Sequence, residues 1–149
     1  MLHANLLQLK MNKQRVLILC TGNSARSQMA EAMLRHEAGD RFEVFSAGIK
    51  PSRVHPEAIA VMREIGLDLS GHRSKHVDEF AGQSFDYVLT VCDQAHEACP
   101  VFPGRSVAIH KDFADPAAAP GSEAERRAMF RTIRDQIREY LRGFPPCKL

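Results

Sequence analysis

No stretch of the 149-residue sequence approaches the roughly 20 consecutive apolar residues that a membrane-spanning helix needs. The beginning of the chain, 1–15, has four leucines but is broken by polar residues, so it is not a secretory signal. A net charge of +2 is too small to indicate a nucleic-acid or membrane partner. Internal repeats and low-complexity tracts are also absent. We therefore expect one soluble cytoplasmic domain with an ordinary core.

The four cysteines, Cys20, Cys92, Cys99 and Cys147, lack the spacing of a structural zinc site, whose ligands come in pairs about two to four residues apart. A disulfide framework is not expected in a reducing compartment. Redox or nucleophilic chemistry is the better interpretation. Cys147 follows two prolines near the end of the chain, and we assign it no role.

Apolar patterning predicts strands and helices in alternation. The strands are predicted in four short apolar segments: 16–19, 42–45, 85–91 and 106–109. Helices are predicted at 27–38, from Pro56 to Gly66, and from the capping box of Ser122 and Glu125 to Gly143. Gly39 is predicted to end the first helix in a left-handed conformation.

This alternation predicts an α/β fold, a single domain with a four-stranded parallel sheet flanked by helices on both faces. Residues 1–14 are expected to be an extension outside the core, 15–144 the domain and 145–149 a flexible tail. Ligands of such sheets bind at the carboxyl ends of the strands, and the motif after the first strand lies there.

The loop after the first strand, 20–27, has a cysteine, five residues and an arginine, and opens into a helix. Such a loop can wrap its N–H groups around a tetrahedral oxyanion at the positive end of the helix. Arg26 would hold two oxyanion oxygens, and Ser27 could donate a hydrogen bond to Cys20. Gly22 would let the backbone approach the anion, and Asn23 tolerates the left-handed conformation. The expected anion-binding residues are Thr21, Gly22, Asn23, Ser24, Ala25, Arg26 and Ser27.

This loop resembles that of the low-molecular-weight protein tyrosine phosphatases and of the arsenate reductases built on their fold. The resemblance extends over nearly the whole chain. The resemblance implies that the loop binds phosphate or arsenate and that Cys20 attacks it. Segment 88–100 resembles the redox segment of the thioredoxin-coupled arsenate reductases, since Cys92 and Cys99 are seven residues apart and Pro100 follows. Reducing As(V) to As(III) takes two electrons, which a single thiol cannot supply without a second one.

Asp115 and Pro116 match the Asp-Pro of this family, whose aspartate protonates the leaving group. The phosphatases usually have tyrosine next, whereas this chain has Ala117, as the reductases do. Asp115 is therefore the expected general acid, and Asp112 is the lesser alternative.

Other residues are expected to support the loop. Glu31 and Ser46 match positions that buttress it in the reductases and that in some members help to enclose a potassium ion. Here Arg73 and Lys75 occur where those members have oxygen ligands, so a lysine ammonium could replace the ion, and we predict no metal and no cofactor.

The remaining polar residues are given structural interpretations. Four histidines have no metal-ligand spacing and are expected to be solvated or structural: His72, His76, His96 and His110. Five arginines of the last helix are expected to form its solvated face: Arg126, Arg127, Arg131, Arg134 and Arg138.

The resemblance therefore implies an arsenate reductase in which oxidation passes from Cys20 to Cys92 and then to Cys99, with thioredoxin or glutaredoxin as electron donor. If 92–99 were one helix, the two cysteines would be about 10.5 Å apart along its axis, whereas a disulfide needs Cα atoms about 4.4–6.8 Å apart. The segment must then unwind during turnover. We expect a monomer. The alternatives are a tyrosine phosphatase, which needs only Cys20, Arg26 and Asp115, and a non-enzymatic oxyanion sensor.

Overall fold

A computed structural model describes residues 13–146, and its centre is a parallel sheet of four strands. The strands lie in the order β2-β1-β3-β4 and comprise β1 (Gln14–Cys20), β2 (Phe42–Gly48), β3 (Tyr87–Thr90) and β4 (Val107–His110). All four predicted strands are confirmed, as is their parallel pairing. β1 begins one residue inside the predicted N-terminal extension, because Gln14 pairs with Phe42. Cys147 lies outside the described residues.

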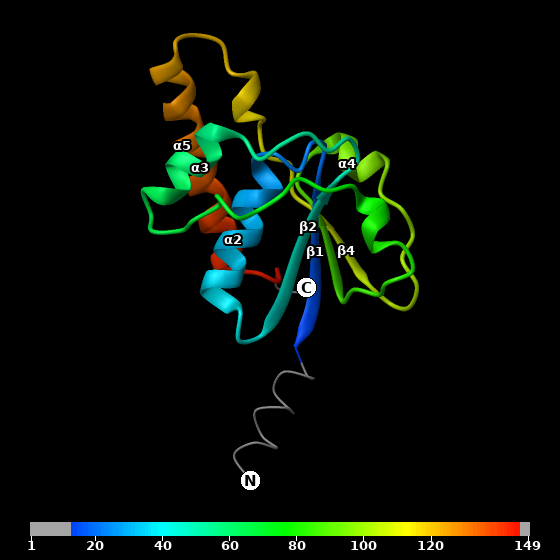
Figure 1. Cartoon of the computed structure of the whole chain (residues 1–149). Helices are drawn as coiled ribbons and strands as arrows, with labels where there is room; N and C mark the ends of the chain where they lie inside the picture. Colours follow the sequence, from blue (N-terminus) through cyan, green and yellow to red (C-terminus); the bar gives the residue numbers. More distant parts are fainter. Residues whose placement is uncertain (1–12, 147–149) are drawn as a thin grey trace.

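Helices cover both faces of the sheet, as predicted (Figure 1). Three helices pack together on one face: α2 (Arg26–Ala38), α3 (Pro56–Arg63) and α5 (Glu123–Arg142). The short helix α4 (Asp93–Glu97) lies on the other face, and 3₁₀ turns are formed by η1 (Val77–Phe80) and η2 (Pro116–Ala118). In the described part of the chain, no helix is long and apolar enough to cross a membrane.

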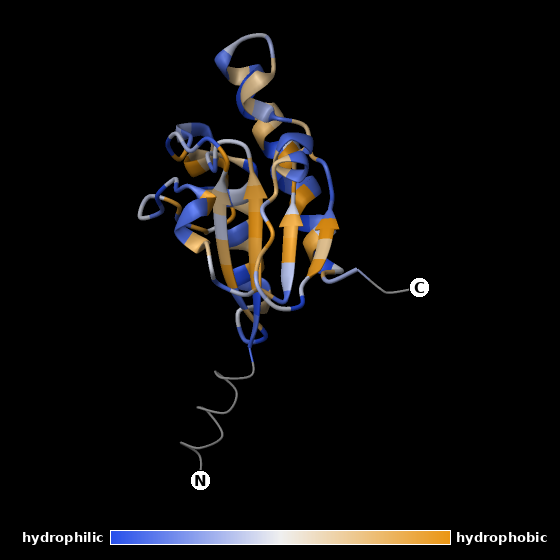
Figure 2. Ribbon diagram, turned by 90° about the vertical axis from the view of Figure 1, so that its right-hand side faces the viewer, coloured by the Kyte–Doolittle hydropathy of each residue, from blue (hydrophilic) through white to orange (hydrophobic). Residues whose placement is uncertain are grey.

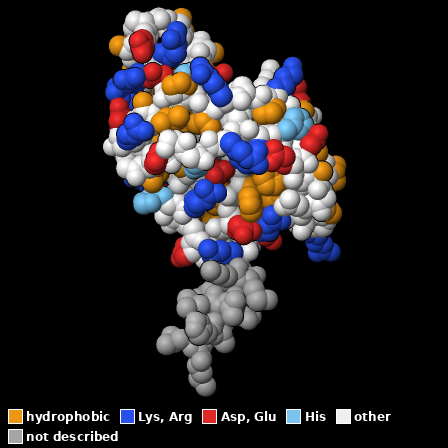
Figure 3. Space-filling view, viewed as in Figure 1, with side chains coloured by type: hydrophobic (Ala, Val, Ile, Leu, Met, Phe, Trp, Pro, Cys, Tyr) orange, Lys and Arg blue, Asp and Glu red, His pale blue; other side chains and the backbone are white. Residues whose placement is uncertain are grey.

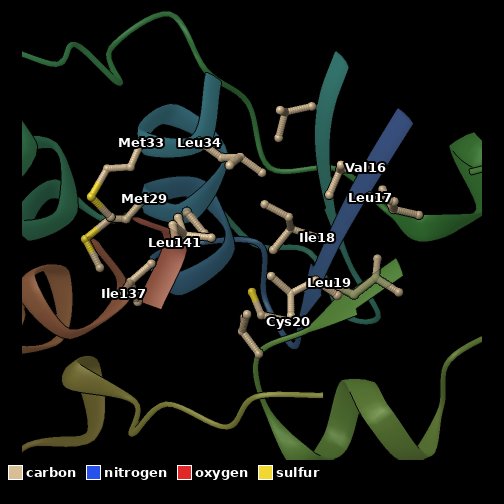
Figure 4. Packing of buried hydrophobic residues seen from close by; sticks show 14 of the residues in the cluster. Val16, Leu17, Ile18, Leu19, Cys20, Met29, Met33, Leu34, Ile137 and Leu141 are labelled. Carbon is tan, nitrogen blue, oxygen red and sulfur yellow. The ribbon is translucent and has the colours of Figure 1, made fainter. Parts of the chain in front are cut away.

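The core lies between β1 and the helices α2 and α5. The apolar strands form a continuous band through the molecule (Figure 2), and 16–19 are fully buried. Helix α2 contributes Met29, Met33 and Leu34, and α5 contributes Ile137 and Leu141 (Figure 4). Each fully buried side chain of this size stabilises the fold by about 1.5–3 kcal/mol. This packing fixes the end of β1, where the loop begins.

The helix ends agree with the sequence except at Gly39. Ser122 and Glu125 form the predicted capping box, with both reciprocal hydrogen bonds present. Gly66, at the end of the second predicted helical segment, has a left-handed φ of 81°. Gly39, however, has φ −65° and ψ −14°, so its predicted left-handed conformation is wrong. The chain continues in a right-handed turn there, and the N–H of Arg41 donates to the carbonyl of Ala38.

The basic side chains of α5 are not simply solvated. Arg127 pairs with Glu57 of α3 at 2.6 Å, and Arg131 pairs with Glu64 at 2.8 Å. Arg134 is buried and donates to the carbonyl of Val61 and to Glu64. The expectation of a solvated face is wrong for Arg134, because α3 packs beside it and leaves it buried. It is confirmed for Arg131, which is exposed although it is paired with a carboxylate. Figure 3 shows acidic and basic side chains interspersed over the visible face, without an extended basic surface there.

Candidate active site

The loop after β1 turns its carbonyl groups outward. Four of these carbonyls accept hydrogen bonds from backbone N–H groups of segment 49–55, at 2.8–3.3 Å: those of Cys20, Thr21, Gly22 and Ser24. Within each planar peptide the N–H points away from the carbonyl, so these bonds direct the loop's N–H groups inward. The inward face encloses a hollow of about 230 Å³. An inward ring of N–H groups at a helix N-terminus is suited to a tetrahedral oxyanion.

The Cys20 sulfur lies in the wall of this hollow and accepts two hydrogen bonds. The backbone N–H of Asn23 donates to it at 3.2 Å, and Ser27 Oγ lies 2.8 Å away. Asn23 Nδ2 donates to the same Ser27 oxygen at 2.8 Å, which leaves the hydroxyl proton of Ser27 for the sulfur. These hydrogen bonds fix the Cys20 sulfur in the wall of the anion hollow, as expected of a nucleophilic cysteine.

Asn23 organises the loop from its centre. It is fully buried and has the left-handed conformation that the sequence predicted, with φ 47°. Its Nδ2 also donates to Ser46 Oγ of β2 at 3.0 Å. Its Oδ1 accepts from the N–H of Lys75 and from Gln28 Nε2, both at 3.0 Å. One amide side chain therefore connects the loop to β2, α2 and segment 73–75.

The buried carboxylate of Glu31 lies behind this network. Ser46 donates to Glu31 Oε1 at 2.6 Å, and Lys75 Nζ lies 3.9 Å from the same oxygen. Arg35 and His72 lie 2.9 and 3.7 Å from the other oxygen. Burial lowers the pKa of Lys75, and the charge of Glu31 opposes that shift. Cationic groups of the chain itself therefore surround Glu31.

Arg26 and Asp115 face each other across the mouth of the loop. Arg26 Nη1 donates to the carbonyl of Phe113 at 2.9 Å, and its Nη2 lies 3.9 Å from Asp115 Oδ2. Both side chains line the anion hollow and an adjoining hollow of about 330 Å³. Asp112 lines only the adjoining one. Asp115 is thus the better placed of the two candidate acids.

Cys92 lies beside the loop, where the expected relay would need it. It is the N-cap of α4, and its sulfur accepts a hydrogen bond from the N–H of Ala95 at 3.4 Å. Thr21 Oγ1 is 3.2 Å from the same sulfur and also donates to Gln94 Oε1 at 3.0 Å. Cys92 lines the adjoining hollow with Arg26 and Asp115, although it is distant from Cys20 in sequence.

Cys99 lines neither the anion hollow nor the adjoining one. Helix α4 ends at Glu97, so 92–99 is not one continuous helix, and Cys99 follows the C-cap Ala98. Cys99 lines a separate hollow of about 730 Å³, together with 86–88, 100–102 and 104–108, and burial raises the pKa of its thiol. The three described cysteines are free thiols.

The histidines have structural contacts. His72 contacts Gln28, and His76 caps η1 by accepting from the N–H of Asp78. His96 and His110 stack on each other with ring centroids 4.3 Å apart. No cluster of three potential metal ligands occurs among residues 13–146.

Sequence reasoning missed three contributors to the site. Gln28 binds Asn23, Gln94 binds Thr21, and Gly48 lies directly against the loop backbone. A Cβ added at Gly22 would meet only ordinary contacts within the protein, and the close approach of Gly22 to an anion stays a prediction. Gly48 could have been identified from the pairing register of β1 and β2, because that register places it opposite Cys20 at the start of the loop.

Comparisons with known proteins agree with this geometry. The family model described as low molecular weight phosphotyrosine protein phosphatase matches residues 15–146. An arsenate reductase of Halalkalibacterium halodurans is 42% identical over 134 residues, which cover 90% of this chain and 96% of that protein. The arsenate reductase of Bacillus subtilis is 40% identical with the same coverage.

Solved structures give the same result. A structure described as an arsenate reductase in the intermediate state is 32% identical, with a TM-score of 0.71 over 87% of this chain and 95% of that one. A tyrosine phosphatase of Erwinia amylovora has a TM-score of 0.71 at 21% identity, over 89% of this chain and 91% of that one, and shares the fold.

Proposed function

The chain belongs to the low molecular weight phosphotyrosine protein phosphatase family and, within it, to the arsenate reductases, and we propose that it reduces arsenate to arsenite through Cys20, Cys92 and Cys99. One observation carries the proposal: a second thiol, Cys92, contacts the anion loop through Thr21 and lines the same hollow as Arg26. Phosphate ester hydrolysis has no need of that thiol, whereas a two-electron reduction has.

In the first step arsenate occupies the loop 20–27, bound by the inward N–H groups and Arg26. The thiolate of Cys20 attacks arsenic and forms a sulfur–arsenic bond. One arsenate oxygen departs, and Asp115, at the mouth of the loop, supplies its proton. Arsenic is still As(V) at this point.

In the second step the sulfur of Cys92 attacks the sulfur of Cys20. The disulfide between them forms as the sulfur–arsenic bond breaks, and its electron pair stays on arsenic, which leaves as arsenite. Two thiols are thereby oxidised and arsenic gains two electrons. The contact with Thr21 and the hydrogen bond from the N–H of Ala95 hold the Cys92 sulfur beside the loop for this attack.

In the third step Cys99 attacks Cys92, a Cys92–Cys99 disulfide forms, and Cys20 leaves as a thiolate. A protein dithiol, thioredoxin or alternatively glutaredoxin, then reduces this disulfide with two electrons. Cys99 is suited to this exchange because it is half-buried and away from the anion hollow. A monomeric enzyme in the reducing cytoplasm fits such an exchange.

No resident metal is part of this proposal. Where some reductases of the family bind potassium, the ammonium of Lys75 lies 3.9 Å from the buried carboxylate of Glu31. We propose that this ammonium, with Arg35 nearby, supplies the positive charge at that place.

A coupled assay tests the function. Thioredoxin, thioredoxin reductase and NADPH are mixed with the enzyme and arsenate, phosphate or no anion, and NADPH consumption is followed. Arsenate alone should sustain turnover, and Cys20→Ser should abolish it. Cys92→Ala should also abolish it, whereas Cys147→Ala, at a cysteine without a step in the relay, should behave as the unaltered protein.

The same variants distinguish an arsenate reductase from the alternative, a tyrosine phosphatase. Hydrolysis of p-nitrophenyl phosphate needs the loop and Asp115 and should survive in Cys92→Ala. Steady hydrolysis together with no arsenate-dependent NADPH consumption would identify a phosphatase. Anion binding without either activity would identify an oxyanion sensor. Replacing thioredoxin by glutaredoxin and glutathione identifies the electron donor.

A further inference from the structure

One imidazole, that of His110 at the end of β4, connects three parts of the fold beside Cys92. Its Nδ1 lies 2.8 Å from the hydroxyl of Thr90, the last residue of β3. Its Nε2 lies 2.9 Å from Asp93 Oδ1, in the first turn of α4. Its ring stacks on His96, in the last turn of α4, with centroids 4.3 Å apart and planes 26° apart.

These partners fix the orientation of the ring. A carboxylate only accepts hydrogen bonds, so Nε2 carries the proton that Asp93 receives. The Thr90 hydroxyl can donate to Nδ1, and Thr90 itself is buried. Asp93 directly follows Cys92, so fixing the Asp93 side chain also restrains the Cys92 backbone.

Helix α4 depends on such contacts. It has five residues, far fewer than the roughly 12–15 that an isolated helix needs to be even marginally stable in water. Ala95 is the buried residue of the helix. The side-chain contacts of Asp93, Gln94 and His96 therefore weigh heavily in whether α4 stays folded.

The two thiol exchanges of the proposed relay require different conformations of segment 92–99. While Cys92 attacks Cys20, α4 has to be folded, because Cys92 then keeps its hydrogen bond from Ala95 and its contact with Thr21. For the next exchange the segment has to open, since Cys99 lies beyond the end of α4 in a different hollow.

We propose that His110 is a positioning residue for the thiol relay, which holds α4 folded during the first transfer and whose contacts with Asp93 and His96 must break before Cys99 can reach Cys92. The proposal rests on the proposed function for its meaning in turnover. Its structural part concerns the reduced protein alone and can be measured without arsenate.

Hydrogen–deuterium exchange of the reduced protein tests that structural part. The N–H groups of Ala95, His96 and Ala98 are bonded within the 92–98 turn and report its opening. His110→Ala should speed their exchange about tenfold, the ratio given by about 1.4 kcal/mol, which is the size of one or two lost hydrogen bonds. Exchange in β1 should stay unchanged, which shows that the domain is folded.

Further variants keep the test decisive if His110→Ala disturbs the strand. His96→Ala removes only the stacked ring, and Asp93→Ala removes only the carboxylate, so each should speed exchange about threefold. Asp93→Asn retains an acceptor oxygen and should restore slow exchange. His36→Ala, at an exposed histidine of α2 on the other face of the sheet, is the matched control. Unchanged exchange of the 92–98 peptide in all His110, His96 and Asp93 variants would overturn the proposal.

Single-turnover mixing with arsenate tests the role in turnover. In His110→Ala, arsenite release should slow about threefold, whereas conversion of the Cys20–Cys92 disulfide to the Cys92–Cys99 disulfide should become faster, and KM for arsenate should not change. General damage to the fold would slow both steps and thereby contradict the proposal. If the unaltered protein releases no arsenite, the proposed function fails, and the exchange result still decides the structural part.

Discussion

Gly48 is the position at which the smallest change should do the most damage to the anion loop. A Cβ added there would lie 2.6 Å from the carbonyl oxygen of Thr21 and 2.8 Å from the N–H nitrogen of Asn23, where ordinary contacts begin at 3.4 Å. Both neighbours are backbone atoms, so no side-chain rotation can relieve the clash. In Gly48→Ala the loop must move by roughly 0.8 Å, and overpacking of this kind typically costs about 1–3 kcal/mol.

The effect on chemistry should exceed the effect on stability. A misplacement of about 1 Å in a reacting geometry can cost about 100-fold in rate, so we expect Gly48→Ala to lose about 10- to 100-fold in kcat/KM for arsenate. Phosphate should also protect Cys20 from iodoacetamide less well, because the inward N–H groups no longer converge. Urea unfolding measures the accompanying loss of stability.

Gly71→Ala is the matched control for this prediction. A Cβ at Gly71 would meet nothing within 4 Å, so the same chemical change should leave activity and phosphate protection as they are. Gly48→Ala with normal kcat/KM and normal phosphate protection would refute the view that the close approach of β2 shapes the loop.

Further predictions concern individual groups. Asp115→Asn should slow arsenite release at least tenfold in a single turnover while phosphate still protects Cys20, because it removes the proton donor and leaves the loop intact. Since burial raises the pKa of the Cys99 thiol from its ordinary value, formation of the Cys92–Cys99 disulfide should still accelerate as the pH is raised into the alkaline range in quenched single turnovers. Lys75→Ala should lower the free energy of unfolding by about 1–3 kcal/mol, and KCl should restore more of it than NaCl. Hydrogen bonds from Arg131 and then Arg134 lower the pKa of Glu64 to about 2, so its stabilisation is present above pH 4.5 and lost as the pH falls toward 2. Glu64→Gln should accordingly be less stable than the unaltered protein at pH 7, and the difference should shrink steadily in urea titrations from pH 5 to pH 3.

The features that could be predicted from sequence are those in which neighbouring residues carry the information. The buried strand, the cysteine-to-arginine loop and the following helix are contiguous, and Asn23 adopts the conformation that its residue type permits. The four parallel strands followed from apolar runs alternating with helical patterns. Cys92 was found through its resemblance to a family segment, and the structure then placed it beside Thr21.

The features that were missed depend on contacts between distant segments. Gly48 matters only because β2 pairs with β1 in a register that places it against the loop. From the sequence, Arg134 was expected to be solvated. In the structure it pairs with Glu64, which the packing of α3 against α5 places beside it. At Gly39 the prediction of a left-handed helix end was wrong, because the chain turns toward β2 in a right-handed conformation that any residue can adopt.

The hydroxyl of Thr21 is where the anion loop and the redox helix meet, and it has one proton for two partners. While Cys92 is a thiol, Thr21 can accept from the sulfur and donate to Gln94 Oε1. Once Cys92 is a thiolate, the sulfur only accepts, so the Thr21 proton turns to it and the hydrogen bond to Gln94 is lost. Ionisation of Cys92 thus strengthens its own contact with the loop and removes one of the contacts that keep α4 folded. The charge that Cys92 needs for its attack on Cys20 therefore also brings α4 closer to the opening that Cys99 requires.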